Sequence, residues 1–426
     1  MDAVYGDGSR ASRSVAPIAT PSVNDHAESS KRNETKPVGN ATGATVKRKA
    51  VDESKDDNTV PGSHSVSDHA EEHSKRVKLD NETEAPVLAE ITKTMTATDS
   101  EVLSNYNKAF TLLKENTPEQ RLDVQLPYET FLQLDQAFSE LKSVEGISED
   151  QRYPSLGYNS LTQTATVVTC PSNIHERAAR WIERKIINYV EDYLSTHSPH
   201  TVDNISECGS TTQHFGFGEY TRSRKEPDGG FIYMTRSGSD KLMIAIEVGT
   251  SETYDELLDD KDMWINGKGV NVVILVCFEE LPLFRNPNTR YTNIAGVAAE
   301  KEAMAQSLAE TVETNITLGY YGPHEYRDHT WIGELNKAFI EVWRQDSRYK
   351  FDLIQDGFAL APEDLPGTLN LRISDFYPHD VWQAANIEDN DIPFDSAEFL
   401  RSLMNSTKIV AQLRFESYLR EKLRLR

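Results

Sequence analysis

Hydrophobic residues recur at helical spacing in several stretches of this chain. The longest stretch follows Pro171-Ser172-Asn173 and covers residues 174–194, with apolar side chains at Ile174, Ala178, Trp181, Ile182, Ile186, Tyr189 and Tyr193. This pattern predicts one long amphipathic helix. Helical spacing also begins near Ser100 and again after Leu126-Pro127, so we expect a helical region over residues 98–170 that leads into the main core.

Short apolar and β-branched runs predict strands over residues 164–169, 231–234, 242–248 and 270–278. Between the last two lies a helix with defined ends, because Thr253 and Glu256 form a capping box and Asn266-Gly267 stops it. A strand–helix–strand crossover makes its two strands parallel and places the helix across one face of the sheet. The predicted fold class is therefore α/β, with a helix packed across a sheet that contains a parallel pair of strands.

Helical spacing returns beyond Pro282. It covers residues 295–311, residues 331–344 (through Ile332, Leu335, Phe339, Val342 and Trp343) and residues 406–426, which end in basic residues. The pattern predicts a largely helical C-terminal extension over residues 286–426.

Residues 1–97 have no sustained apolar period and consist mainly of polar and charged residues, which predicts a disordered tail. The tail contains two basic clusters, Lys47-Arg48-Lys49 and Lys75-Arg76-Val77-Lys78-Leu79-Asp80. The second cluster has the same six residues as the nuclear-import signal of the Myc transcription factors, and so resembles a segment that an import receptor binds. Ordinary solvated charge is the alternative for either cluster alone. Together they favour the nucleus.

Composition narrows the function classes. A net charge of −23 over 426 residues repels phosphate at long range, which argues against a protein that simply coats nucleic acid. No apolar run is long enough to cross a bilayer, and the first residues lack the apolar stretch of a signal peptide. Three cysteines are too few for a disulfide framework, which fits a reducing compartment.

Three ionisable residues interrupt apolar patterns around the predicted crossover. Glu247 ends the apolar strand 242–248, and Asp228 stands at the entrance to the strand before it. Lys261 falls in the apolar stripe of the helix, whose acidic residues mostly occupy the outer face. Because buried charges are costly alone and acceptable when paired, we expect these three side chains to converge. The alternative for Lys261 is an amine that extends past its neighbours into solvent.

Such a set predicts metal-dependent phosphate chemistry. Asp228 and Glu247 would bind Mg²⁺ or Mn²⁺ through carboxylate oxygens, with the Val248 carbonyl as a third ligand. The metal would polarise a scissile phosphate and lower the pKa of a bound water. Lys261 would orient that water or offset charge that develops on the phosphorus.

The same residues carry a family resemblance. Pro227-Asp228, Glu247-Val248-Gly249-Thr250-Ser251, Lys261 and Gly269-Val270 together resemble the PD-(D/E)XK restriction-endonuclease-like superfamily. Within it, the chain is most similar to the Uma-type endonucleases, and it also resembles uncharacterised fungal proteins with the same Glu-Val-Gly core and a downstream Trp-rich helix. The resemblance covers about a quarter of the chain. It implies a restriction-endonuclease-like mixed sheet flanked by helices, and magnesium-dependent phosphodiester cleavage. The chain departs from the usual pattern at Gly249, where that superfamily has its lysine, so Lys261 would be a displaced lysine.

Two further sets of residues are candidates for this site. Glu176, on the first turn of the long helix, would join it because the superfamily often places an acid there; a solvated glutamate favoured by the helix dipole is the alternative. Arg222, Arg224 and Lys225 precede the Pro-Asp turn and would hold phosphates beside the metal, unless they form a solvated loop.

The sequence thus predicts a disordered tail (residues 1–97), a helical region (98–170), a nuclease-like core (171–285) and a C-terminal extension (286–426). The leading hypothesis is a nuclear, Mg²⁺-dependent nuclease that acts on DNA or RNA. A catalytically inactive relative that serves as a nucleic-acid or protein interaction module is the second hypothesis. The third is a structural protein in which Glu247 and Lys261 form only a buried ion pair. Nuclease folds of this kind commonly form dimers when they cut both strands, so a homodimer is a candidate assembly, although the sequence shows no interface.

Overall fold

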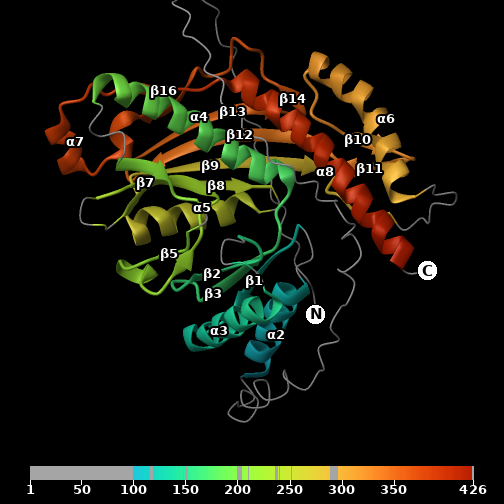
Figure 1. The fold of residues 1–426 in the computed structure, drawn as a ribbon, viewed down its shortest axis with the longest axis horizontal. Helices are drawn as coiled ribbons and strands as arrows, with labels where there is room; N and C mark the ends of the chain where they lie inside the picture. The colour runs from blue at the N-terminus through green and yellow to red at the C-terminus, as the bar shows by residue number, and fades with distance from the viewer. Residues whose placement is uncertain are drawn as a thin grey trace, which may run out of the picture. The chain divides into compact units, whose positions relative to one another are not determined.

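A computed structural model describes residues 99–115, 119–146, 148, 152–198, 204–209, 211–235, 238, 240–250, 252–287 and 296–424. The expected tail over residues 1–97 and its two basic clusters lie outside these described residues. Within them, two larger sheets with helices on their faces, together with two small two-stranded sheets, form a mixed α/β fold (Figure 1). No helix in these ranges is both long and apolar enough to span a membrane.

The larger sheet has seven strands in the order β14-β13-β12-β9-β8-β7-β4. Its strands are β4 (Ile205–Glu207), β7 (Gly229–Tyr233), β8 (Lys241–Gly249), β9 (Val272–Leu281), β12 (Glu334–Arg344), β13 (Ser347–Gln355) and β14 (Phe358–Ala359). Only β8 and β9 pair in parallel; the other neighbours are antiparallel. The parallel pair confirms the predicted crossover.

Helices cover both faces of this sheet. The long helix α4 (Asn173–His197) packs with α6 (Val297–Leu318) and α8 (Ser396–Arg424) over one face, in a core that includes Ile182, Ile246 and Phe399. The crossover helix α5 (Tyr254–Asp262) and the π-helical turn η3 (Met263–Lys268) cover the opposite face, where Leu257 and Trp264 pack on Ala245 and Leu275. Successive side chains along a strand point to opposite faces of the sheet, so each strand contributes alternate residues to each of the two cores.

The crossover helix begins as expected. The Thr253 side chain accepts a hydrogen bond from the Glu256 N–H, and the Glu256 carboxylate accepts one from the Thr253 N–H. Its end differs from the prediction, because the chain continues through η3 and stops at Gly269, whose positive φ of 75° suits a glycine.

The smaller sheet has the order β1-β3-β2-β6-β5. Its strands are β1 (Arg121–Gln125), β2 (Ser155–Asn159), β3 (Thr164–Val168), β5 (Gln213–His214) and β6 (Arg224–Lys225). Helices α2 (Asp99–Glu115) and α3 (Tyr128–Glu145) pack on one face and close a separate core that contains Leu113, Phe131 and Val167. The region expected to be helical over residues 98–170 therefore also supplies three strands, and residues 213–225 complete their sheet.

The C-terminal segment mixes helices with strands. Helices α6 and α8 confirm the predictions over residues 295–311 and 406–426. The helix expected over residues 331–344 is wrong: the chain there forms β11 (His329–Ile332) and β12, and β12 pairs along most of β9. Alternate burial in a central strand produced apolar positions that also match helical spacing. The predicted domain boundary at residue 285 therefore separates β9 from β12, two strands that pair in the same sheet.

The remaining elements of this segment are short. They are β10 (His324–Tyr326), β15 (Thr368–Arg372), β16 (Asp391–Pro393) and α7 (His379–Ala385), with 3₁₀ turns η4 (Ile373–Phe376) and, earlier in the chain, η2 (Gly218–Tyr220). The η4 turn places Phe376 against Phe231 of β7, which extends the core over the edge of the large sheet.

Candidate active site

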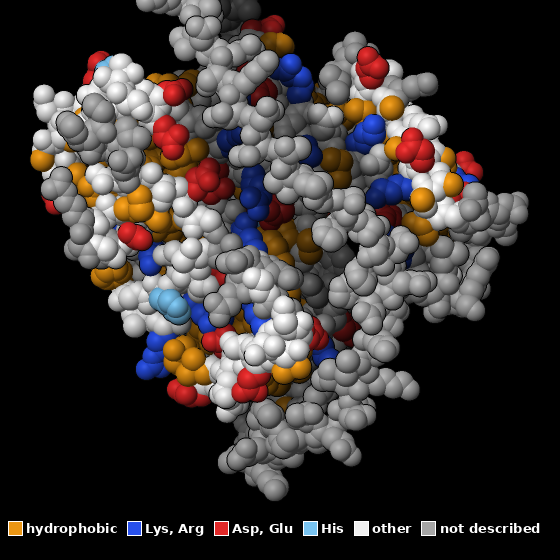
Figure 2. Space-filling model, viewed as in Figure 1, with side chains coloured by type: hydrophobic (Ala, Val, Ile, Leu, Met, Phe, Trp, Pro, Cys, Tyr) orange, Lys and Arg blue, Asp and Glu red, His pale blue; other side chains and the backbone are white. Residues whose placement is uncertain are grey.

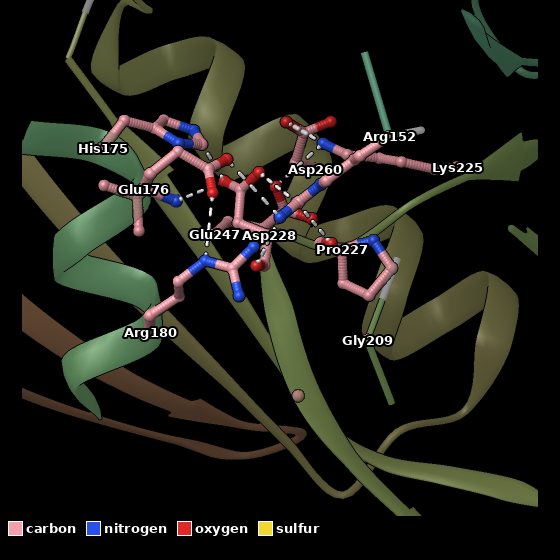
Figure 3. Close-up of polar contacts among 12 residues, drawn as sticks. Arg152, His175, Glu176, Arg180, Gly209, Lys225, Pro227, Asp228, Glu247 and Asp260 are labelled. Carbon is pink, nitrogen blue, oxygen red and sulfur yellow. Dashed lines mark hydrogen bonds and ion pairs between the residues drawn. The ribbon is translucent and has the colours of Figure 1, made fainter. Parts of the chain in front are cut away.

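Asp228 and Glu247 lie side by side where β7 begins and β8 ends. The Asp228 N–H donates to the Ile246 carbonyl at 3.0 Å, and the next residue pair, Gly229 and Ile246, is in register. Antiparallel pairing thus brings the Pro-Asp turn next to the only acidic residue of β8. The two carboxylates predicted from the sequence meet at one cavity (Figure 3).

Asp228 accepts hydrogen bonds at both of its oxygens. Arg152 Nη2 donates to Oδ1 at 3.0 Å, while the Val248 N–H at 2.8 Å and His175 Nε2 at 3.0 Å contact Oδ2. Burial alone would raise the pKa of Asp228, but His175 and Arg152 hold it well below its usual range. Burial would likewise lower the pKa of His175, and the Asp228 carboxylate raises it instead. Asp228 is therefore an anion held between the Arg152 guanidinium and the His175 imidazole.

Glu247 has a different environment. Its side chain is 3% exposed; Trp264 Nε1 donates to Oε1 at 2.5 Å, and Lys225 Nζ contacts Oε2 at 3.2 Å. Burial raises the pKa of Glu247 well above its usual value, and the nearby carboxylates of Asp228, Asp260 and Glu252 raise it further, against the opposing effect of Lys225. Around Glu247, the nearby carboxylates outnumber the one lysine that offsets their charge.

Lys225 is the cation that contacts Glu247. It forms ion pairs with Glu247 and with Asp260 of α5, and these carboxylates together raise its pKa although burial would lower it. Lys225 belongs to β6, a strand of the small sheet, so the pairing of β6 with β2 and β5 brings it to the edge of the large sheet. The sequence marked it as one of three basic residues before the Pro-Asp turn, without separating it from Arg222 and Arg224.

The structure does not bring Lys261 to these carboxylates, which corrects that expectation. Its amine contacts Asp262 Oδ1 at 2.5 Å and lies 4.7 Å from the centre of the Trp343 ring. Neighbouring residues on a helix point about 100° apart, and here Asp260 points to the site while Lys261 points to β12. The pattern had assigned Asp260 to the outer face, yet this residue is 8% exposed.

Glu176 lies at the edge of the site. Its Oε1 is 3.6 Å from Arg152 Nη1, and its Oε2 is 3.3 Å from Arg180 Nε. The same arginine, Arg152, therefore links Glu176 to Asp228, as Figure 3 shows. Arg222 and Arg224 have other partners, since Arg222 lies over the Tyr128 ring and Arg224 pairs with Asp135 at 2.6 Å.

Two residues of the site carried no signal of their own in the sequence. Arg152 precedes β2, and Glu252 lies just beyond β8, where it pairs with Arg121 of β1. Burial raises the pKa of Glu252, and Arg121 partly offsets this effect. The Arg152–Asp228 contact joins the segment before β2 to the large sheet, and the Arg121–Glu252 contact joins β1 to the residues after β8. Because each contact links separate parts of the chain, no spacing within one segment indicates it.

These side chains line a cavity of about 350 Å³. One wall consists of Asp228, Glu247 and residues of α5, including Asp260; the other consists of residues from β1, β2 and β3. Most of the residues that line it are polar or charged, which favours a ligand with polar groups.

The donor set fits Mg²⁺ in kind. Magnesium prefers hard oxygen ligands, is often held by one or two carboxylates, and keeps several of its waters. Asp228 and Glu247 supply such oxygens, and the excess of buried anions around Glu247 is what a divalent cation would neutralise. Within the described ranges, no group of three or more His, Cys, Asp or Glu side chains surrounds a common point. A bound ion would therefore share Asp228 and Glu247 with the cations that contact them.

Comparisons of the chain with protein-family models, with curated proteins and with solved structures found no match.

Proposed function

We propose that this protein is a metal-dependent phosphodiesterase that acts on nucleic acid in the nucleus. The observation that carries the proposal is the meeting of Asp228 and Glu247, from adjacent strand ends, with Lys225 in one polar cavity. Two acids and a lysine at this position of a sheet are also the residue types of the PD-(D/E)XK superfamily, which the chain resembles through Pro227-Asp228 and Glu247.

Each side chain has a role that its surroundings support. Mg²⁺ or Mn²⁺ held by Asp228 and Glu247 would polarise the phosphate and supply a nucleophilic water near neutral pH. Arg152 and His175 keep Asp228 ionised and fix its direction. Lys225, which remains protonated, offsets negative charge on the phosphate oxygens, the task that Lys261 was expected to perform.

Local positive charge supports a nucleic-acid substrate despite the net charge of −23. Arg177, Arg180 and Arg184 are exposed on α4, whose first turn carries His175 and Glu176. Figure 2 shows several Lys and Arg side chains in a short column down the middle of the face in view. A few arginines near the site can bind phosphates while the rest of the surface repels them. The nuclear location rests on the basic cluster at residues 75–80 and its expected import receptor.

One observation favours a second candidate, a catalytically inactive nuclease fold that serves as an interaction module. All four oxygens of Asp228 and Glu247 already contact a side-chain cation or an N–H group. If Lys225 and Arg152 keep these contacts, they take the place of a metal, and the site is an ion-pair network beside a nucleic-acid surface.

Purified full-length protein incubated with DNA and RNA, in Mg²⁺, Mn²⁺ or EDTA, tests the two candidates. The proposal expects metal-dependent cleavage that Glu247→Ala abolishes. Metal-dependent binding without cleavage supports the interaction module. Absence of metal binding by calorimetry, together with a lower melting temperature of Glu247→Ala, leaves only a structural role for the cluster.

A further inference from the structure

The small sheet presents a polar face to the cavity. Along β1, β2 and β3, alternate residues such as Val124, Leu156 and Val167 are buried against α2 and α3. The residues between them point the other way, and those that line the cavity include Asp123, Gln125, Asn159, Thr164 and Thr166. Because this sheet has its own apolar core on the other side, its folding does not require so many hydrogen-bonding side chains on this face.

Hydrogen bonds fix the positions of these side chains and leave some of their donors and acceptors available. Gln125 Nε2 donates to Thr164 Oγ1 at 2.9 Å, and Thr166 Oγ1 donates to Asp123 Oδ1 at 2.5 Å. Gln125 has a second amide hydrogen and a carbonyl oxygen, and a carboxylate can accept several bonds. The face thus offers donors and acceptors at fixed positions, which is what recognises the edge of a base or the hydroxyls of a sugar.

The size and depth of the cavity limit what can enter. Its volume of about 350 Å³ lies at the small end of the roughly 300–1,000 Å³ of ligand sites, which suits one nucleotide rather than a duplex. Glu247, on the opposite wall, is 3% exposed. A phosphodiester can reach it only if its nucleotide leaves a base-paired stack, and a single strand does so at the lowest cost.

We infer that the polar face of β1, β3 and β2 binds the base and sugar of one unpaired nucleotide, and so restricts the protein to single-stranded nucleic acid or unpaired ends. This inference deepens the proposed function and rests on it for the identity of the ligand. The cavity contains four Lys or Arg side chains, Arg121, Arg152, Arg224 and Lys225, among a larger number of acids, so few charges are free to neutralise phosphates. Affinity then depends more on hydrogen bonds than on neutralised phosphates, and binding weakens only modestly with salt.

Gly157 gives a direct way to fill the cavity. It lies on β2 between the buried Leu156 and Tyr158, so a side chain at this position points into the cavity. A Cβ atom there would be 3.5 Å from the Arg224 carbonyl oxygen and 3.9 Å from Thr166 Cβ, which is ordinary contact. A valine suits a strand and occupies the space that the nucleotide would need.

The experiment measures fluorescence anisotropy with Glu247→Gln protein in Mg²⁺, which prevents cleavage during the measurement. Single-stranded and blunt duplex oligonucleotides of equal length are compared, with a nucleoside monophosphate as competitor. We expect the single strand to bind at least about tenfold more tightly than the duplex, and Gly157→Val to remove most of that preference. Gln125→Ala, which leaves the backbone unchanged, should weaken binding to a smaller extent.

Leu132→Gln serves as the matched control, because Leu132 is exposed on α3, on the far side of the same sheet. Equal binding of duplex and single strand, or preference unaffected by both Gly157→Val and Gln125→Ala, overturns the inference. The inference is also overturned if the nucleoside monophosphate binds but the single-stranded oligonucleotide does not. If the wild-type protein cleaves duplex and single strand equally well, the proposed function stands and this inference fails. If single strands bind in a Gly157-dependent manner and the wild-type protein cleaves neither DNA nor RNA, the proposed function fails instead.

Discussion

Glu247 and Glu341 are two of the buried glutamates of the large sheet, and they differ mainly in their surroundings. Glu341 of β12 is 0% exposed; Tyr254, Trp343 and Arg348 all contact its oxygens, at distances of 2.5–3.0 Å. Glu247 of β8 likewise accepts a tryptophan N–H and contacts a basic side chain. Both residues interrupt apolar strands, so local pattern alone does not distinguish them.

The difference lies in the neighbouring charge and space. The contacts of Glu341 come from a phenol, an indole and an arginine, and it does not line the cavity. Glu247 faces the cavity and is surrounded by Asp228, Asp260 and Glu252. A buried carboxylate with sufficient donors stabilises a fold, whereas one crowded by other carboxylates next to open space is the arrangement expected of a cation site.

Helix α5 separates the two environments. Its first residue, Tyr254, contacts Glu341, and Asp260 near its end faces Lys225. Lys261 turns toward Trp343 and so belongs to the Glu341 side. Lys225 therefore belongs to the Glu247 site, whereas Lys261 packs beside Trp343 near Glu341.

The largest effect is expected from Glu247→Gln. The amide keeps the shape and can still accept from Trp264, but it removes the charge needed to hold a metal, so cleavage should fall by about 10²–10³-fold or more. Single-turnover cleavage in Mg²⁺ measures this, with circular dichroism to confirm folding. Retained cleavage in a folded variant would make Glu247 no more functional than Glu341.

Lys225→Met and Lys261→Met form a matched pair. Loss of Lys225 leaves the carboxylates of Glu247 and Asp260 without their cation, and we expect a loss of about 10²-fold in cleavage. Lys261→Met removes a contact with Asp262 and one with the Trp343 ring, each worth about 1 kcal/mol or less, and cleavage should persist. The opposite ranking, measured at equal folded fraction, would restore Lys261 to the site.

Glu341→Ala should affect stability and leave the chemistry intact. It strands the Tyr254 hydroxyl and the Trp343 N–H, and unsatisfied buried groups cost about 1–3 kcal/mol each, so the free energy of unfolding should fall by about 2–4 kcal/mol. Urea denaturation measures the change. Cleavage per folded molecule should match the wild type; a selective loss of cleavage would remove the contrast between the two glutamates.

The smallest effect concerns Glu183 of α4, whose Oε1 accepts from the Gly230 N–H at 2.7 Å. Burial raises its pKa to about 7 from 4.5, with Glu207 adding to the rise and Arg152 and Arg180 opposing it. A raised pKa in the folded state means that its stabilisation is complete below pH 4.5 and is lost as the pH rises through about 7. Relative to Glu183→Gln, the wild type should lose about 2 kcal/mol between pH 5 and pH 8. Parallel stability curves for the two proteins would show that Glu183 does not titrate in this range.

The sequence by itself determined the elements whose signals are local. The capping box at Thr253 and Glu256, the helix after Ser172 and the parallel pair of strands all follow from residues close together in the chain. It also indicated Asp228 and Glu247, because a carboxylate next to an apolar strand is costly unless it has partners. Local spacing failed at residues 331–344, where the apolar positions suit a helix as well as a strand and only pairing with β9 decides between them.

The tertiary structure alone decided which cations meet those carboxylates. Lys225 reaches Glu247 because β6 joins a sheet built mostly from residues 121–168, and Arg152 reaches Asp228 from a segment 76 residues away. Lys261 and Asp260 are adjacent in the chain and face different partners, since one step along a helix turns a side chain by about 100°. Charge pairing depends on distances of a few ångströms between separate strands and helices, and that information arises only when the two sheets pack.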